Sequence, residues 1–272
     1  SGYSGHRVAV NDKGVVMKSI LLTGINGTVA QAMKKQLDGR YEVSGISMAR
    51  MEDVLEEKPT TWKQQMDSYR ERVMEQLTTA CRGKDAIVHH GWNTRDENWQ
   101  AGLDPLNIML VDCVYQAAIA ENVPRIYMTS SVHSYDFMGD GFDEDAPIPP
   151  TPDTRRDPFG TRPTSLYGVS KRWMEIGGLF YAPKLSPEQK ILVVRLGAVN
   201  ASGEPSENFA RLWYSHEDMS NLLAAFIECD DAPNFWITYG VSNNLSDAHP
   251  TAMFDTVNPY GFTPKDNAFD RI

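Results

Sequence analysis

Short apolar runs of strand length recur along the chain, and stretches with the period of a helix separate most of them. The first run lies in VVMKSILLTG and stops at glycine, and a helical stretch, TVAQAMKKQL, follows it. Similar runs cover residues 41–47, 85–91, 125–131, 190–197 and 235–240, with helix-like segments such as 105–122 and 165–182 between them. Strands that alternate with helices predict an α/β fold, with a doubly wound parallel sheet covered on both faces.

The region between the second and third clear runs leaves two interpretations open. The stretch TTWKQQMD alternates like a strand but contains few β-branched or aromatic residues, and residues 51–82 could instead be mostly helix. Further along, residues 136–164 are acidic, rich in proline and without a period, which indicates a loop over a site. Ser215 and Asp218, three residues apart, predict a capping box at the start of the helix that follows.

We expect one large domain over residues 17–272, with substrate-binding elements at about 136–164 and in a small C-terminal portion, 199–272. Residues 1–16, rich in glycine and serine, have no period and are expected to be a loose tail or a cloning remnant. No run reaches 18 apolar residues and the start lacks a signal-peptide core, so the expected location is the cytoplasm and no membrane partner is expected.

Charge and cysteine content exclude two further classes of partner. The net charge of −10 argues against nucleic acid, because binding to phosphate backbones needs clustered Lys and Arg. The three cysteines, Cys81, Cys113 and Cys229, are far apart and have no metal-ligand spacing. We therefore expect free thiols and no metal site.

The first strand–helix junction has the pattern of a dinucleotide site. Gly24, Gly27 and Ala30 form G-x-x-G-x-x-A, where small residues allow a tight turn and let backbone N–H groups approach a pyrophosphate at the helix N-terminus. This pattern predicts a Rossmann-type sheet that binds a nicotinamide dinucleotide. The residues expected to contact the cofactor here are Gly24, Asn26, Gly27, Thr28 and Val29.

The end of the second strand favours NADP over NAD. An acidic residue that would hold the ribose 2′-OH of NAD is absent there. Ser47 and Arg50 offer a hydroxyl and a guanidinium that could bind a 2′-phosphate instead. Asp67 is a further candidate, for a contact with the adenine.

The stretch SLYGVSK places Tyr167 and Lys171 four residues apart, on one face of a helix. A tyrosine that exchanges a proton with an alcohol near neutral pH needs a lowered pKa, and a nearby ammonium group favours the phenolate. A hydroxyl that holds the substrate oxygen is also needed. Ser131, at the end of the run RIYMTSS, should lie beside this helix and supply it.

Together these residues resemble the extended branch of the short-chain dehydrogenase/reductase superfamily, from about residue 18 to the end. The resemblance implies that Tyr167 is the acid/base, that Lys171 binds the nicotinamide ribose, and that Ser131 orients the reacting oxygen. It also implies that Asn107 holds a water molecule in the proton relay, and that the protein is a homodimer formed through the helices bearing Asn107 and Tyr167.

Within this branch, the stretches LYGVSK, SSVH, WYSHED and GFTPKDNA are most similar to uronate dehydrogenases and related sugar dehydrogenases that oxidise C1. That resemblance implies substrate contacts by Thr94 and His133, although His133 could instead be structural, and His89 and His90 are expected to pack at a strand end. The arginine that binds the uronate carboxylate in that family is replaced by Asn208, with Arg211 one turn further on. The spacing from Ser131 to Tyr167 and the stretch YGVSNN are closer to archaeal NAD-dependent glucose-6-phosphate dehydrogenases.

The sequence therefore predicts an NAD(P)-dependent sugar dehydrogenase that oxidises the anomeric carbon of an aldose or uronic acid to a lactone. A sugar-phosphate dehydrogenase is one alternative, and a nucleotide-sugar epimerase or dehydratase of the same superfamily is another. A non-catalytic dinucleotide sensor is a third, but such proteins tend to lose the Tyr or the Lys, and both are present here.

Overall fold

The structure of the chain is a computed structural model that describes residues 10, 14, 16–48, 61–92, 105–135 and 163–272. Predicted contacts at Arg50 and Thr94, and nearly all of the expected loop over the site, lie outside these residues.

Six parallel strands form the sheet of the described part of the chain, in the order β2-β1-β3-β4-β5-β6. Each lies within one of the apolar runs that the sequence marks as strands. Their bounds are Ser19–Thr23 (β1), Glu42–Ile46 (β2), Ala86–His89 (β3), Arg125–Ser131 (β4), Lys190–Leu196 (β5) and Phe235–Gly240 (β6). The strand order reverses at β1, between β2 and β3, which is where α/β sheets of this kind bind ligands.

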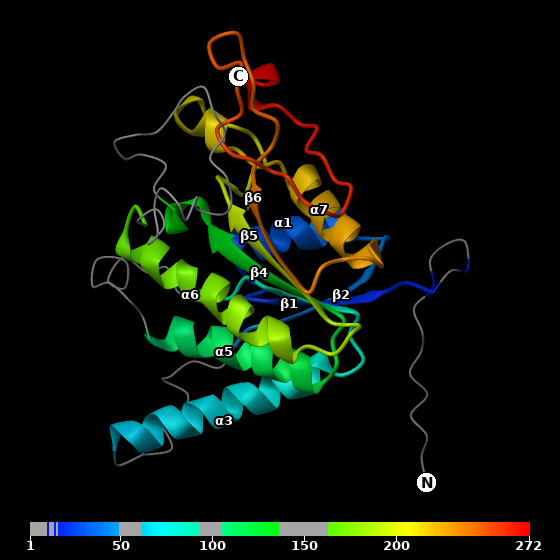
Figure 1. Ribbon diagram of the computed structural model, residues 1–272, viewed down its shortest axis with the longest axis vertical. Coiled ribbons are helices and arrows are strands. Elements are labelled where there is room, and N and C mark those ends of the chain that lie inside the picture. The colour runs from blue at the N-terminus through cyan, green and yellow to red at the C-terminus, as the bar shows by residue number, and fades with distance from the viewer. Residues whose placement is uncertain (1–9, 11–13, 15, 49–60, 93–104, 136–162) are drawn as a thin grey trace.

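Helices cover both faces of the sheet, as the alternating pattern predicted. The longer helices are α1 (Thr28–Leu37), α3 (Trp62–Cys81), α5 (Pro105–Ala120), α6 (Leu166–Tyr181) and α7 (His216–Glu228). Figure 1 shows α3, α5 and α6 on one side of the sheet and α1 and α7 on the other. Four short 3₁₀ helices are η1 (Val132–Ser134), η2 (Ala182–Lys184), η3 (Glu207–Leu212) and η4 (Ala268–Asp270). The predicted Rossmann-type fold is confirmed.

The stretch TTWKQQMD is the start of a helix and not a strand. Thr61 caps α3 through a capping box with Gln64, in which each side chain accepts from the other residue's backbone N–H. From Tyr69 onward the buried side chains of α3 recur every four residues, at Val73, Leu77 and Cys81. This helical period, and not the short alternation before it, decides the conformation of the segment.

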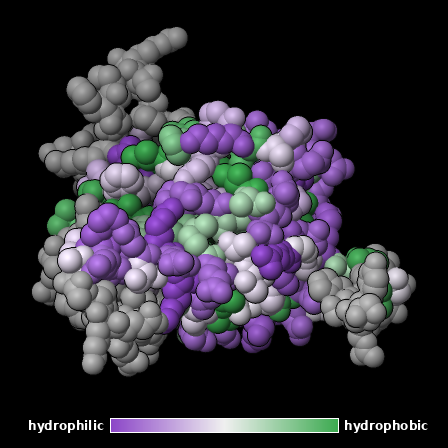
Figure 2. Space-filling model, turned by 90° about the horizontal axis from the view of Figure 1, so that it is seen from below, coloured by the Kyte–Doolittle hydropathy of each residue, from purple (hydrophilic) through white to green (hydrophobic). Residues whose placement is uncertain are grey.

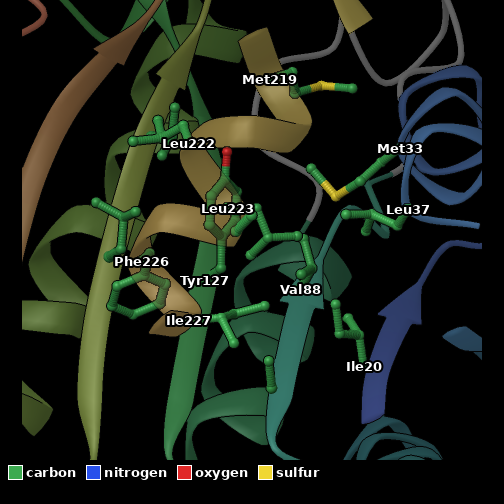
Figure 3. Packing of buried hydrophobic residues seen from close by; sticks show 14 of the residues in the cluster. Ile20, Met33, Leu37, Val88, Tyr127, Met219, Leu222, Leu223, Phe226 and Ile227 are labelled. Atoms are coloured by element: carbon green, nitrogen blue, oxygen red, sulfur yellow. The ribbon is translucent and has the colours of Figure 1, made fainter. Parts of the chain in front are cut away.

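The core consists of two apolar layers, one on each face of the sheet. In the layer shown in Figure 3, α1 and α7 pack on β1, β3 and β4. Its labelled residues are Ile20, Met33, Leu37, Val88, Tyr127, Met219, Leu222, Leu223, Phe226 and Ile227. The other layer joins the sheet to α3, α5 and α6. Because both layers are fixed by apolar packing, the strand ends between them form a rigid edge.

Only half of the expected capping box forms at α7. The Ser215 hydroxyl accepts from the Asp218 N–H (2.9 Å), as predicted. The buried Asp218 carboxylate accepts instead from the Ser242 hydroxyl (2.7 Å) and from the N–H groups of Lys265 and Asp266 (3.0 Å each). Ser242 in turn accepts from the Ser215 N–H (3.0 Å). Asp218 thus fastens the C-terminal segment to α7.

The surface seen from below in Figure 1, where α3 lies, is mainly hydrophilic, with small and separate apolar groups (Figure 2). Among the described helices, none is at once long enough and apolar enough to cross a membrane.

Candidate active site

Two cavities lie at the carboxyl ends of the strands, and they share Ser131, Leu196 and Gly197. The smaller one, of about 330 Å³, lies between the start of α1, the ends of β3 and β4, and α6. The larger one, of about 550 Å³, is enclosed by η1, η3 and parts of the C-terminal segment. A ligand in each cavity would therefore meet the other at Ser131.

The glycine turn fits the expected pyrophosphate. Gly24 follows β1 with a φ of +63°, and a Cβ atom on it would lie 2.6 Å from the Gly91 Cα. Gly27, which precedes α1, offers no side chain to cap its first N–H groups. Gly27, Thr28 and Val29 line the smaller cavity. Uncapped N–H groups at a helix N-terminus, with no side chain in the way, suit an anion such as a dinucleotide phosphate.

Thr23, the last residue of β1, holds the segment that follows β3 against the glycine turn. Its hydroxyl oxygen accepts from the N–H groups of His90 and Gly91 (3.2 Å each) and lies 2.7 Å from His89 Nδ1. With both acceptor positions used, the hydroxyl proton is assigned to the bond to Nδ1, which makes His89 a neutral imidazole. Burial, which lowers the pKa of His89 to about 3, has the same consequence. His89 is buried packing, as predicted, whereas His90 also lines the smaller cavity.

At the end of β2, Ser47 is held in place by two side chains. Asn26 Nδ2 donates to Ser47 Oγ (2.8 Å), and Gln76 Nε2 donates to the Ser47 carbonyl (2.9 Å). The structure thus brings Asn26 and Ser47 together beside the glycine turn. Asp67 lies on the exposed side of α3, where it pairs with Lys63 one turn earlier.

Tyr167, Lys171 and Ser131 lie together in the wall of the smaller cavity. A hydrogen bond joins the Tyr167 hydroxyl to Ser131. Lys171 is buried, and its ammonium group donates to the Thr129 carbonyl (2.8 Å) and lies 4.3 Å from the centre of the Trp92 ring. The ring of Tyr167 is 5.8 Å from the same nitrogen. The predicted grouping of these three residues is present.

The expected lowering of the Tyr167 pKa by Lys171 is wrong for this geometry. Burial raises the pKa of Tyr167 to about 12, and the hydrogen bond with Ser131 opposes this shift. Burial also lowers the pKa of Lys171 to about 7, so its ammonium form is itself disfavoured. Lys171 is buried, with its nitrogen directed at a backbone carbonyl, and Tyr167 is half-buried in the wall of the smaller cavity.

His133 follows Ser131 in η1 and lines the larger cavity. Its backbone N–H donates to Ser131 Oγ (3.2 Å), and its Nδ1 lies 2.7 Å from Thr164 Oγ1. The rings of His133 and Tyr167 meet edge to face, with centres 6.2 Å apart. Burial lowers the pKa of His133, which favours the neutral imidazole. His133 is therefore beside Ser131 and Tyr167, in a position to hydrogen-bond a ligand in the larger cavity.

Asn208 and Arg211 both come from η3 and line the larger cavity. Arg211 Nη2 donates to the Thr251 carbonyl at a long 3.4 Å, and its buried Nε has no hydrogen-bond partner among the described residues. Asn107 is buried in the first turn of α5 and does not line either cavity. Its expected place in the proton relay stays a prediction.

Several cavity residues were not found from the sequence. Thr129, Ser130, Leu196 and Gly197 lie at the ends of β4 and β5, and the strand-end position itself could have identified them. Trp92, whose ring lies beside the Lys171 nitrogen, also lines the smaller cavity and could have been identified because it follows β3. Residues of the larger cavity from irregular or short elements could not be found in this way, and they include Glu207, Phe209, His249, Met253 and Phe269.

The chain is similar to several sugar dehydrogenases along most of its length. L-arabinose 1-dehydrogenase (NAD(P)(+)) of Haloferax volcanii is 26% identical, with 93% of this chain and 98% of the relative covered. Uronate dehydrogenase of Agrobacterium fabrum is 28% identical (93% and 86% covered), and NAD-dependent glucose-6-phosphate dehydrogenase of Haloferax volcanii is 27% identical (92% and 94% covered). Among solved structures, a mutated uronate dehydrogenase matches the fold with a TM-score of 0.66 at 20% identity, over 94% of this chain and 84% of that one.

The sequence model described as the NAD dependent epimerase/dehydratase family matches residues 20–225, which include the glycine turn, Ser131, Tyr167 and Lys171. The match confirms the expected branch of the superfamily, and with the dehydrogenase relatives it supports a nicotinamide cofactor. The chain belongs to the NAD-dependent epimerase/dehydratase family and is a nicotinamide-dependent oxidoreductase.

Proposed function

We propose that this protein is a sugar dehydrogenase that oxidises the anomeric carbon of an aldose or a uronic acid to a lactone. The observation that carries the proposal is the position of Ser131, which lines both cavities and forms a hydrogen bond with Tyr167. The relatives that cover nearly the whole chain are dehydrogenases of a pentose, a uronate and a sugar phosphate, which supports this class of substrate.

In this proposal the chain's own residues bind the sugar and move its proton. A bound nicotinamide supplies the acceptor for the hydride that leaves C1. Tyr167, as phenolate, takes the proton of the anomeric hydroxyl, and Ser131 holds that oxygen while the C–O bond becomes a carbonyl. The hydrogen bond from Ser131 favours the phenolate, against the burial that disfavours it. Lys171 binds the nicotinamide ribose, and Asn107 serves the proton relay.

Substrate contacts are assigned to the residues that line the larger cavity, with Thr94 added from the sequence. His133 and Asn208 would hydrogen-bond the sugar hydroxyls. Arg211 favours an anionic substrate, because it brings a guanidinium to the wall of the larger cavity. A sugar phosphate is therefore the second candidate, beside a uronate, and NAD-dependent glucose-6-phosphate dehydrogenase of Haloferax volcanii supports it.

The preferred cofactor is proposed to be NADP. Ser47 and Asn26 present polar groups at the end of β2. The two described residues that follow this strand are Ser47 and Met48, and neither has a carboxylate that could bind the ribose 2′-OH of NAD. Arg50 would complete the contact with the 2′-phosphate, and Asp67 would contact the adenine. Gly24 and Gly27–Val29 would bind the pyrophosphate.

A homodimer in the cytoplasm, with α5 and α6 at its interface, completes the proposal. Five apolar side chains of α6 are substantially exposed, and they are Leu166, Trp173, Ile176, Leu179 and Phe180. Residues 17–272 are proposed to act as one domain, with the segment from 199 onward supplying most of the substrate contacts.

A panel of aldoses, uronates and sugar phosphates, each with NAD and with NADP, tests the activity by absorbance of the reduced cofactor. We expect net formation of reduced cofactor with at least one free sugar, and faster with NADP. An epimerase or dehydratase would retain its cofactor through the cycle and give none. Absence of reduced cofactor with every sugar would contradict the proposal.

The Tyr167→Phe variant tests the mechanism. It removes the group that takes the proton, and we expect turnover to fall at least about 1,000-fold while cofactor binding, measured by fluorescence titration, stays within about twofold. Tyr127→Phe is the matched control, because the Tyr127 hydroxyl is buried without a partner among the described residues and lies outside both cavities. A Tyr167→Phe variant with near-normal kcat would show that another group takes the proton.

A further inference from the structure

Glu175 on α6 is a buried carboxylate that both cavities leave untouched. It lies one helical turn after Lys171 and two turns after Tyr167, and its exposed fraction is only 5%. Four donors converge on it: the hydroxyls of Ser130 (3.0 Å) and Ser134 (2.7 Å), and Nε and Nη2 of Arg195 (2.8 Å each). These four hydrogen bonds fix the position of the carboxylate.

The two serines bracket the residues that face the substrate. Ser130 precedes Ser131, and Ser134 follows His133, so the segment 130–134 is held at both ends. Both hydroxyls donate to the same oxygen of Glu175, Oε1. The helix that carries Tyr167 is thereby tied to both ends of the short segment that carries Ser131 and His133.

Arg195 binds both oxygens of the carboxylate from within the sheet, through Nε to Oε1 and Nη2 to Oε2. It pairs in register with Ser130 on β4 and with Tyr239 on β6. Its guanidinium lies 4.6 Å from the Tyr135 ring centre and 5.3 Å from that of Tyr239, and Nη1 donates to the Tyr239 hydroxyl (3.3 Å). A buried ion pair gives little net stability compared with apolar side chains of the same volume, because both charges lose their hydration. What this pair supplies is a fixed geometry.

We propose that Glu175, oriented by Arg195, is a positioning residue that holds Ser131 and His133 in place against Tyr167. The inference rests on the proposed dehydrogenase function. Glu175 touches neither cavity, so it acts through the segment 130–134 and not on a ligand.

Ser134→Ala tests this role with little risk to the fold. It removes one of the two hydrogen bonds from serine hydroxyls to Glu175 and leaves the Glu175–Arg195 ion pair intact. We expect kcat to fall about tenfold, since a small misplacement of a reacting group is costly, with KM for the cofactor within about twofold. The matched control is Thr238→Val, which removes a buried hydroxyl that donates to the Val257 carbonyl (3.2 Å). It should lower the melting temperature by a similar amount and leave kcat unchanged.

Amide hydrogen exchange supplies a readout that needs no turnover. The N–H of His133 donates to Ser131 Oγ, and the N–H of Thr164 donates to the His133 carbonyl (3.0 Å). Ser134→Ala should accelerate exchange at both amides at least about tenfold, and Thr238→Val at neither. Unchanged exchange, or faster exchange with kcat within twofold of the wild type, would overturn the positioning role. If the wild type reduces no cofactor with any sugar, the proposed function fails, and exchange alone decides whether Glu175 fastens the segment.

Discussion

Lys171 has a buried ammonium group whose described neighbours only partly replace water. The Thr129 carbonyl accepts one hydrogen bond, and the rings of Trp92 and Tyr167 lie near the nitrogen. A desolvated cation over an aromatic face gains about 2 kcal/mol. Burial nevertheless lowers the pKa of Lys171 from 10.5 to about 7, so the folded chain carries a penalty for keeping this residue charged.

This penalty predicts how stability depends on pH. Between pH 7 and 10.5 the unfolded chain keeps the proton of Lys171 and the folded chain releases it, so the free energy of unfolding rises with pH in this window. Lys171→Met removes the contribution. We expect the variant to be more stable than the wild type by about 1–3 kcal/mol at pH 7, with the difference shrinking toward pH 10. Urea denaturation at pH 7, 8.5 and 10, without added nucleotide, measures it.

The control for this comparison is Lys34→Met, which replaces an exposed lysine of α1 and should show no such trend. Cys81 and Cys113, whose pKa values burial raises to about 12 and about 11, titrate alike in both proteins and cancel in the difference. A difference between Lys171→Met and wild type that grew with pH would contradict a lowered lysine pKa.

At the residue level, the sequence was sufficient to predict that Ser131, Tyr167 and Lys171 lie together, but not the direction of their pKa shifts. The prediction rested on their residue types and spacing, which can be read directly from the sequence. The pKa values depend on burial between β4 and α6, which brings together residues far apart in the chain. A short motif contains no information about that environment.

At the level of elements, the contact between α6 and η1 determines how Tyr167 meets Ser131. Gly168, directly after Tyr167, lies so close to η1 that a Cβ atom on it would be 1.9 Å from the His133 carbonyl oxygen. Only glycine allows this approach. Helix α6 therefore starts against the backbone that carries His133.

Gly168→Ala should separate the two elements. Alanine would normally favour a helix over glycine by about 1 kcal/mol, but here the backbone of η1 or α6 must move. We expect kcat/KM to fall at least about 100-fold and the melting temperature to drop. Gly177→Ala on the same helix is the control, because the atoms nearest to its Cβ would be side-chain atoms, of Tyr115 at 3.1 Å and of Val111 at 3.8 Å, and not backbone. Equal activity of the two variants would show that the close contact is not needed for turnover.

The elements themselves were largely predictable, because strand and helix periods are local. The six strands fall in the predicted runs, whereas the start of α3 was ambiguous. There the four-residue repeat of Tyr69, Val73 and Leu77 begins only after the misleading alternation. At α7, Ser215 caps as expected, but Asp218 binds Lys265 and Asp266, 47 and 48 residues away. A partner at that distance cannot be read from a capping pattern.

At the scale of the whole molecule, the two cavities depend on parts of the chain that have no common period. The smaller cavity comes from strand ends and the glycine turn, and the fold pattern predicts its location. The larger cavity needs η3 and the segment around His249 and Phe269, which packs through irregular contacts. The class of cofactor therefore followed from the sequence more directly than the identity of the sugar.

The exposed apolar side chains of α6 make a last prediction at this scale. Leu166, Trp173 and Phe180 recur every seven residues, with Ile176 and Leu179 beside them, and each is 43–59% exposed. Such a stripe on a helix indicates a protein interface. We expect Ile176→Glu to convert the proposed dimer to a monomer in sedimentation-velocity experiments, because a carboxylate would be buried without a partner. Val257→Glu, at an exposed apolar position away from α6, should leave the dimer intact. A dimer that Ile176→Glu leaves unchanged would show that the interface lies elsewhere. A monomeric wild type would show that there is no such dimer.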